Sequence, residues 1–189
     1  MQSSNRKKLN YIITGAIIAA AYVALTFISN VFGLAYGEIQ FRLSEVLTIL
    51  PVFTPAAIPG ITIGCFIANT LSFNVLDMVF GSIASLAAAL LTYLCRNIKF
   101  KGLPLLAMFP PVIINALVIG AELAIFFPSR DSLIWSFLFA GATVGLGQLA
   151  VCYVLAVCYV LGIPFYLIVE KHKLFSYDGF SEPKQRPRD

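Results

Sequence analysis

Four ionisable side chains stand out because they lie within, or at the edge of, apolar stretches: Arg42, Glu45, Asp77 and Glu122. The first three belong to one segment, GEIQFRLSEVLTILPVFTPAAIPGITIGCFIANTLSFNVLD, residues 37–77. An ionisable group in lipid is costly unless it is paired or lines a polar cavity, so such residues indicate a functional site. Amide side chains accompany them and complete the candidate site: Gln40, Asn69, Asn115 and Gln148.

The chemistry of this set favours recognition over reaction. The sequence contains no nucleophile–base pair, HExxH motif or phosphate-binding loop, so we do not expect an enzyme. A carboxylate can accept two adjacent N–H donors, such as those on a guanine-like edge, and each amide adds a donor and an acceptor. Four aromatic residues near the outer rim could stack on a flat ring or form an ordinary interfacial belt: Tyr36, Phe41, Phe73 and Trp135.

Structural roles compete with binding at three of these positions. Arg42 and Glu45 are three residues apart and could neutralise each other as a buried ion pair. Asp77 could instead cap the following helix through the backbone N–H of Met78 or Phe80. Together the four ionisable groups would carry a net charge of −2. Either one carboxylate is protonated by burial, or the pocket holds a cation or a donor-rich ligand.

The composition is that of an integral membrane protein. The chain has 189 residues, of which 59% are hydrophobic and 12% charged, whereas soluble domains average about 25% charged. The length suits one domain of five or six spans of roughly 20 residues. No cleavable signal peptide is apparent, so the first apolar run is expected to be retained. The four cysteines and single histidine show no ligand-like spacing, so neither a metal site nor a cofactor is expected.

Six helices account best for the apolar segments and make this an all-α membrane bundle. Prolines interrupt the second apolar stretch, which is too long for one straight span, and divide it into two short helices. The expected helices cover 10–32, 42–54, 57–72, 75–94, 103–127 and 132–169. A basic arm, 1–9, precedes this domain of residues 10–170, and a basic tail, 171–189, follows it.

The distribution of charge predicts the orientation of the bundle. With six spans, the basic N-terminus, the loop RNIKFK and the basic C-terminal tail all lie on one side. The positive-inside rule makes that side cytoplasmic, and both termini with it. A single span over 42–72 would place the basic loop and tail outside. Six spans also bring polar residues from five helices to similar depth in the outer half of the membrane.

A stripe of small residues follows the first helix. Ala16, Ala20 and Ala24 are four residues apart, and Gly15 and Ala19 lie beside them. Such faces let another helix approach closely. The stripe could serve packing within the chain or docking to a partner subunit in the membrane.

The sequence resembles the queuosine-precursor transporter (QueT) family, which comprises S components of energy-coupling factor (ECF) transporters. The resemblance lies in GEIQFRLSEVLTILPVFTPAAIPGITIGCFIAN, LDMVFGSIASLAAALLTYL, PPVIINALVIGAEL and VCYVLGIPF. It implies a six-helix bundle whose outward-facing pocket is capped by the loop after the first helix. It also implies a 7-deazaguanine substrate, such as queuine or its cyano or aminomethyl precursors. A membrane T component, docked on the three alanines, and two ATPase subunits would be the partners.

Roles for the candidate residues follow from this resemblance. Glu45 or Glu122 would grip the guanine-like edge, Asp77 would hold a cationic substituent or cap its helix, and Arg42 would hold Glu45. The three amides Asn69, Asn115 and Gln148 would orient the base. Family members often have Glu where Gln148 stands, and the tandem VCYVLA–VCYVLG lengthens the last helix.

Two other functions remain open from the sequence. One is a stand-alone carrier coupled to protons through Glu122 or Asp77. The other is an S component for a different vitamin-like substrate. No nucleic-acid partner is expected under any of these hypotheses.

Overall fold

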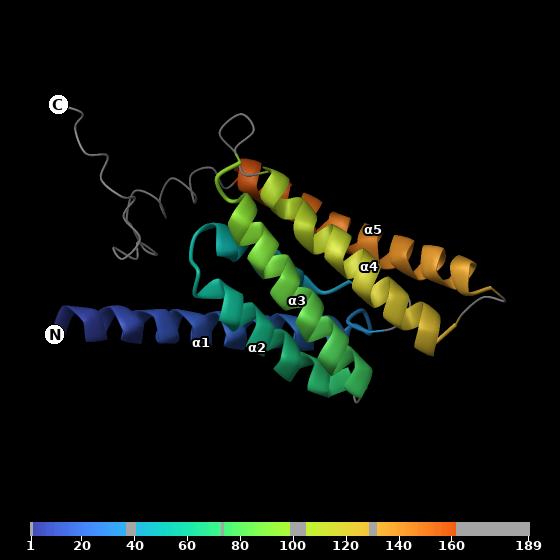
Figure 1. Cartoon of the computed structure of the whole chain (residues 1–189), viewed down its shortest axis with the longest axis horizontal. Helices are drawn as coiled ribbons and strands as arrows, with labels where there is room; N and C mark the ends of the chain where they lie inside the picture. Colours follow the sequence, from blue (N-terminus) through green and yellow to red (C-terminus); the bar gives the residue numbers. More distant parts are fainter. Residues whose placement is uncertain (1, 37–40, 73, 99–104, 129–131, 162–189) are drawn as a thin grey trace, which may run out of the picture.

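The computed structural model describes residues 2–36, 41–72, 74–98, 105–128 and 132–161, and the regular elements within them are all helices. Helices α1 and α2 lie side by side, α3 crosses the middle, and α4 and α5 form the other side of the bundle (Figure 1). Four helical segments are long and apolar enough to span a membrane, and two shorter apolar segments lie between the first and second. The prediction of a six-segment, all-α membrane bundle is therefore confirmed.

Helix α1 (Gln2–Val31) ends in a glycine turn. Gly33 has a φ of 69°, in the left-handed region that glycine adopts without steric cost. The Gly33 N–H donates to the Asn30 carbonyl at 2.8 Å, and the Leu34 N–H donates to the Ser29 carbonyl at 3.0 Å. These two bonds satisfy carbonyls of the last turn, as in a Schellman motif, and redirect the chain.

The segment expected to be a short α-helix over 42–54 is instead the 3-10 helix η1 (Leu43–Val52). Pro51 lies inside it and has no N–H, so it cannot make an α-helical bond to a preceding carbonyl. Helix α2 (Ala57–Asn69) then begins, with Pro59 tolerated in its first turn, and ends in the short 3-10 turn η2 (Thr70–Ser72). Element η1 packs against α1, α3 and α5, which places it within the bundle.

The remaining helices match their predicted ranges closely. Helix α3 (Val75–Cys95) begins where the Asn74 side chain accepts a hydrogen bond from the Leu76 N–H at 3.1 Å. A short 3-10 turn, η3 (Leu105–Met108), leads into α4 (Phe109–Phe126), which has prolines in its first turn. Helix α5 (Leu133–Leu161) continues through most of the tandem hexapeptide. The rest of the predicted last helix, 162–169, lies outside the described residues.

Glycines hold two helix pairs in close contact. A Cβ on Gly60 would lie 2.7 Å from the Gly15 carbonyl oxygen, and one on Gly64 would lie 2.8 Å from the Tyr22 Cβ. These contacts join α1 to α2. Between α4 and α5, a Cβ on Gly120 would lie 2.8 Å from the Gly141 Cα. Larger residues would force the helices of each pair apart.

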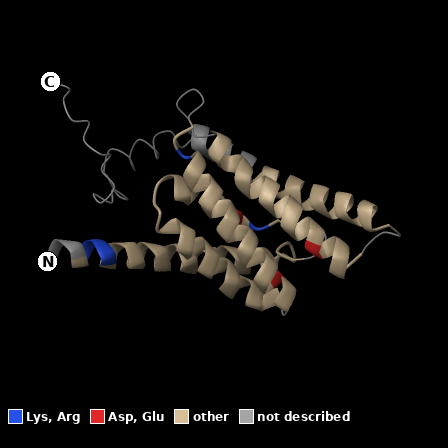
Figure 2. Cartoon of the chain, in the orientation of Figure 1, with Lys and Arg blue, Asp and Glu red and all other residues tan. Residues whose placement is uncertain are grey.

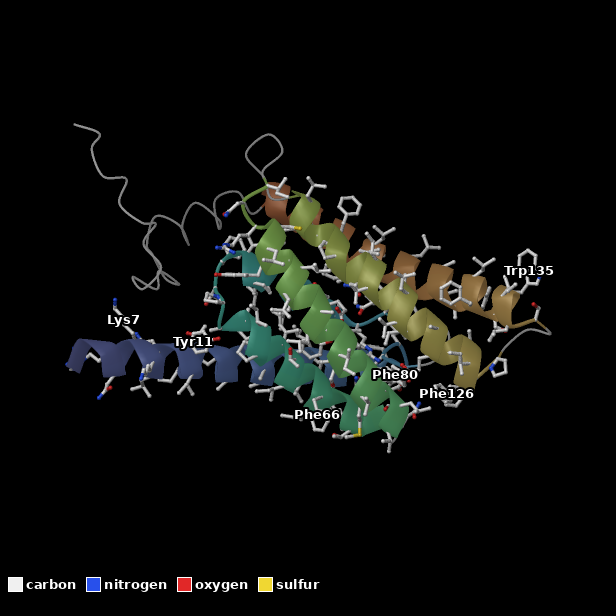
Figure 3. The ribbon with its side chains drawn as sticks, viewed as in Figure 1. Lys7, Tyr11, Phe66, Phe80, Phe126 and Trp135 are labelled. Atoms are coloured by element: carbon white, nitrogen blue, oxygen red, sulfur yellow. The ribbon has the colours of Figure 1, made fainter. Side chains whose placement is uncertain are left out.

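The outer surface of the bundle is apolar. Phe66 and Trp135 are 47% and 66% exposed, and both point away from the helix bundle (Figure 3). Trp135 is thus placed as an interfacial aromatic residue would be, rather than for stacking on a ligand in the interior. Charged residues within the described helices are few (Figure 2). Helix α1 begins, and α3 and α5 end, at the same end of the bundle, as six alternating segments require (Figure 1).

Candidate substrate-binding site

The polar core surrounds a small cavity between η1, α3, α4 and α5. The cavity measures about 20 Å³, which is room for roughly one water-sized molecule. A purine-sized ligand therefore requires the surrounding helices to separate. Four of the predicted site residues are among those that line the cavity, which are Arg42, Glu45, Gly81, Ser85, Asn115, Ile119, Val144, Gly147, Gln148 and Val151.

A chain of hydrogen bonds joins four elements beside this cavity. Glu45 is 6% exposed and accepts from the Tyr22 hydroxyl at 2.6 Å through Oε1 and from Gln148 Nε2 at 3.2 Å through Oε2. Gln148 Oε1 in turn accepts from Asn115 Nδ2 at 3.1 Å. We call Tyr22, Glu45, Asn115 and Gln148 the inner network. It connects α1, η1, α5 and α4, so the structure brings together three of the residues predicted from the sequence.

Tyr22 is the member of the inner network that sequence reasoning missed. It is fully buried, and its neighbours on the same face of α1 are also hydroxyl residues, Thr26 and Ser29. Thr26 Oγ1 donates to Ser44 Oγ at 2.7 Å, and Ser29 Oγ accepts from the Leu43 N–H at 2.9 Å. The spacing of these three hydroxyls, four and then three residues apart, was the available signal, because it defines one polar helix face.

Arg42 does not pair with Glu45 in the structure, contrary to expectation. Its Nε donates to the Ala35 carbonyl at 2.8 Å, and its Nη1 donates to Asn69 Oδ1 at 3.0 Å. The guanidinium also lies 5.0 Å from the centre of the Tyr36 ring, within the range of a cation–π contact. Arg42 therefore anchors the segment after α1 to the end of α2.

Asn69 and Tyr36 complete this anchor. The Asn69 amide is fully buried, and its Nδ2 donates to the Asp77 backbone carbonyl at 2.7 Å. A Cβ on Gly81 would overlap Asn69 Nδ2, so glycine at that position makes room for the amide. The Tyr36 hydroxyl donates to the Ala68 carbonyl at 2.6 Å. Burial raises the pKa of the Tyr36 phenol, which keeps it protonated as a donor.

Asp77 and Glu122, which we call the acidic pair, lie outside the inner network. Asn74, not Asp77, provides the capping side chain of α3, so the capping hypothesis for Asp77 is wrong. Glu122 is 2% exposed, and neither of its carboxyl oxygens accepts a hydrogen bond from a described residue. The Asp77 carboxyl lies close enough to interact with it.

The acidic pair is positioned one helical turn beyond the cavity. On α3, Asp77 precedes the cavity residue Gly81 by four positions; on α4, Glu122 follows the cavity residue Ile119 by three. Residues at these spacings share a helix face. Gln40, the remaining predicted site residue, lies outside the described residues.

The small-residue stripe of α1 divides into two faces. Gly15 and Ala19 are buried against α2, whereas Ala16, Ala20 and Ala24 are exposed. The exposed alanines line a surface groove of about 870 Å³ between α1 and α2, together with Tyr11, Ile12, Gly15, Ala19, Val23, Phe27, Pro59, Gly60, Ile63, Ile67 and Leu71. Packing within the chain therefore uses the face with Gly15 and Ala19. The three alanines predicted to dock a partner stay accessible.

Within the described part of the chain, no three His, Cys, Asp or Glu side chains lie close enough together to bind a metal ion. Cys65 is buried in the apolar core between α1 and α2.

All-helical, multi-pass membrane proteins with a buried polar site form a class that includes small-molecule transporters. The chain belongs to the QueT transporter family, whose model matches residues 12–171. Membership confirms the prediction of a transport protein rather than an enzyme.

One similar protein is the Queuosine precursor transporter QueT of Lactococcus lactis subsp. cremoris (strain MG1363). The two are 42% identical over 81 residues, which are 43% of this chain and 48% of that protein. The match thus spans about half the length of the curated relative. No solved structure matches the chain.

Proposed function

We propose that this protein is the substrate-binding S component of an ECF-type transporter and that it binds a queuosine precursor, a 7-deazaguanine base. The family and the name of the Lactococcus relative support this substrate class. The observation that carries the proposal is the convergence of Glu45, Asn115 and Gln148 on one buried cavity. These side chains offer the acceptors and donors that a guanine-like edge requires.

Binding would exchange hydrogen bonds inside the inner network. When the helices separate, Glu45 can release the Gln148 amide and accept two N–H donors from the base. The freed Gln148 and Asn115 amides then contact the acceptors on the ring. Because N–H donors of the base replace the Gln148 amide, the buried Glu45 carboxylate keeps a hydrogen-bond donor throughout.

Energy would come from other subunits. The exposed Ala16, Ala20 and Ala24 stripe would dock a membrane T component, which two cytoplasmic ATPases drive. In this arrangement both termini, with the basic arm 1–9 and the basic tail 171–189, lie in the cytoplasm. The groove that contains the stripe is lined almost entirely by apolar side chains, as a helix-docking surface in a membrane would be.

The test combines binding with uptake. We expect the purified chain, without partners, to bind a 7-deazaguanine far more tightly than guanine or riboflavin. Uptake into vesicles should require the ATPase subunits. An Ala20→Leu variant should keep its binding affinity and lose uptake. Tight riboflavin binding would instead indicate another vitamin-like substrate.

A proton-coupled carrier is the second candidate, and Glu122 favours it because this carboxyl is buried without a described hydrogen-bond donor, and buried acids in membrane helices commonly serve as proton sites in transporters. Uptake driven by a proton gradient in vesicles without any ATPase would support the carrier and contradict the S-component proposal.

A further inference from the structure

The residues that begin η1 depend on α1 for their hydrogen bonds. Three hydroxyl side chains on one face of α1, which we call the hydroxyl ladder, bond to three consecutive residues of η1. The hydroxyl ladder consists of Tyr22, Thr26 and Ser29. Its members are at most 1% exposed, so these hydrogen bonds lie away from water, where such bonds are stronger.

Two members of the hydroxyl ladder hold the first two residues of η1. Ser29 Oγ accepts from the Leu43 N–H at 2.9 Å. The first N–H groups of a helix have no partner within it, and Arg42, the residue before η1, provides no side-chain cap. Ser29 therefore caps η1 from another helix. The Thr26 and Ser44 hydroxyls, both fully buried, share a hydrogen bond of 2.7 Å.

The third member, Tyr22, holds the carboxylate of Glu45 itself. Its hydroxyl donates to Oε1 at 2.6 Å, while Oε2 accepts from Gln148 Nε2 at 3.2 Å. Each carboxylate oxygen can accept two hydrogen bonds, so both oxygens can accept from a ligand once the amide departs. Glu45 lines the cavity, and the three residues of the hydroxyl ladder do not. The ladder therefore acts on a ligand through Glu45 and not by contact.

The orientation of this carboxylate decides how many donors of a base it can accept. A guanine-like edge presents a ring N–H beside an exocyclic amino group, and one carboxylate accepts both only when its two oxygens lie in the plane of the ring. A rotatable side chain keeps that plane only when other bonds fix it before the ligand arrives. The Tyr22 bond fixes one oxygen of Glu45. The other two bonds of the hydroxyl ladder fix the backbone from which the side chain extends.

We propose that the hydroxyl ladder positions the Glu45 carboxylate and thereby makes the site selective for a base with two adjacent N–H donors over a base with one. This inference rests on the proposed function and adds to it residues that touch no substrate. Loss of a ladder hydroxyl lowers the selectivity for the second donor. A role in stability alone would instead weaken the binding of both bases equally.

The experiment compares two bases that differ by one donor group. 7-Cyano-7-deazaguanine carries an exocyclic amino group beside its ring N–H, and 7-cyano-7-deazahypoxanthine lacks that amino group. Each is titrated calorimetrically into the full chain in lipid nanodiscs. We expect the first base to bind the wild-type chain at least about tenfold more tightly, because it gives the Glu45 carboxylate a second charge-assisted hydrogen bond.

Variants of the hydroxyl ladder assign this ratio of affinities to the positioning of Glu45. Tyr22→Phe should reduce the ratio to about threefold or less, because the carboxylate is no longer held at Oε1. Thr26→Val should also reduce the ratio, whereas Thr26→Ser, which keeps the hydroxyl, should stay within about twofold of wild type. Thr62→Val is the matched control, because the Thr62 hydroxyl donates to the Ile58 carbonyl of its own helix at 2.9 Å. Its ratio should be unchanged.

The outcomes separate this inference from the proposed function. If neither base binds the wild-type chain, the proposed function fails and the positioning role with it. If the bases bind with equal affinity, or if Tyr22→Phe and Thr26→Val weaken both equally, the positioning role is overturned and the 7-deazaguanine function stands. A ratio reduced as far in Thr26→Ser as in Thr26→Val would also overturn it, because the hydroxyl would then not matter. Where Tyr22→Phe does not fold, the two Thr26 variants decide.

Discussion

Two glutamates at similar depth of burial have opposite environments. Glu45 is 6% exposed and Glu122 is 2% exposed. Glu45 receives hydrogen bonds from a tyrosine hydroxyl and a glutamine amide. Glu122 receives none from the described residues and faces another carboxyl.

The contrast shows that burial alone does not reveal the role of a buried acid. A carboxylate whose oxygens are both satisfied links the helices that supply its donors, so Glu45 supports the architecture as well as the proposed site. A carboxylate without donors makes the bundle less stable until a proton or a cation arrives. Replacement of the two residues should therefore change the free energy of unfolding in opposite directions.

The largest effect is expected from Glu45→Ala. This change leaves the Tyr22 hydroxyl and the Gln148 amide buried without their acceptor, at about 1–3 kcal/mol each. We expect a loss of about 2–6 kcal/mol in stability, together with lost 7-deazaguanine binding. Thermal unfolding in detergent measures the loss of stability. An unchanged melting temperature would show that the inner network does not hold the helices together.

Tyr22→Phe tests one arm of the same network. It removes the 2.6 Å bond to Glu45 and should cost about 1.5–3 kcal/mol, the range for hydrogen bonds to charged groups. Tyr93→Phe, near the end of α3, is the control and should lower stability less. Equal losses in the two variants would contradict a special role for the Tyr22–Glu45 bond.

Gly81→Ala tests the region between the two glutamates. The added methyl group would overlap Asn69 Nδ2, so the amide must move away from Arg42 and from the Asp77 carbonyl. Overpacking of this kind costs about 1–3 kcal/mol. Gly145→Ala, where the new Cβ would lie 3.3 Å from the Ala116 Cβ, should be milder. The melting temperature of Gly81→Ala should therefore be the lower of the two. The reverse order would contradict the predicted overlap with Asn69.

The smallest change, and the one of opposite sign, is expected from Glu122→Met. An apolar side chain of similar size removes an unsatisfied carboxyl, so stability should rise by about 1 kcal/mol. A clear loss of stability would mean that Glu122 has a structural partner and would end its contrast with Glu45.

The sequence predicted the helices well because membrane helices are specified by length and hydropathy. The alternation of six segments was sufficient to bring Glu45, Asn115 and Gln148 into one network, although they lie far apart in the chain. Their depth follows from how many residues separate each from the end of its span.

Pairings between side chains were less predictable. The Arg42–Glu45 ion pair was inferred from a spacing of three residues, which assumes that both lie on one α-helix. Arg42 is instead the residue before η1, with extended backbone angles of φ −106° and ψ 115°, so its side chain extends toward Asn69. Tyr22 was missed because its face of α1 was read as a small-residue surface rather than as a polar one.

The 3-10 form of η1 has a consequence for how deep the charges lie. A 3-10 helix rises about 2.0 Å per residue and an α-helix about 1.5 Å, so ten residues extend about 20 Å rather than about 15 Å. That length equals about two-thirds of a hydrocarbon core of about 30 Å. Helix type, and not residue count, thus sets the level of Arg42 and Glu45 relative to the turn at Pro55. Pro51, which disfavours the α-helical form, thereby lengthens the segment between Arg42 and this turn.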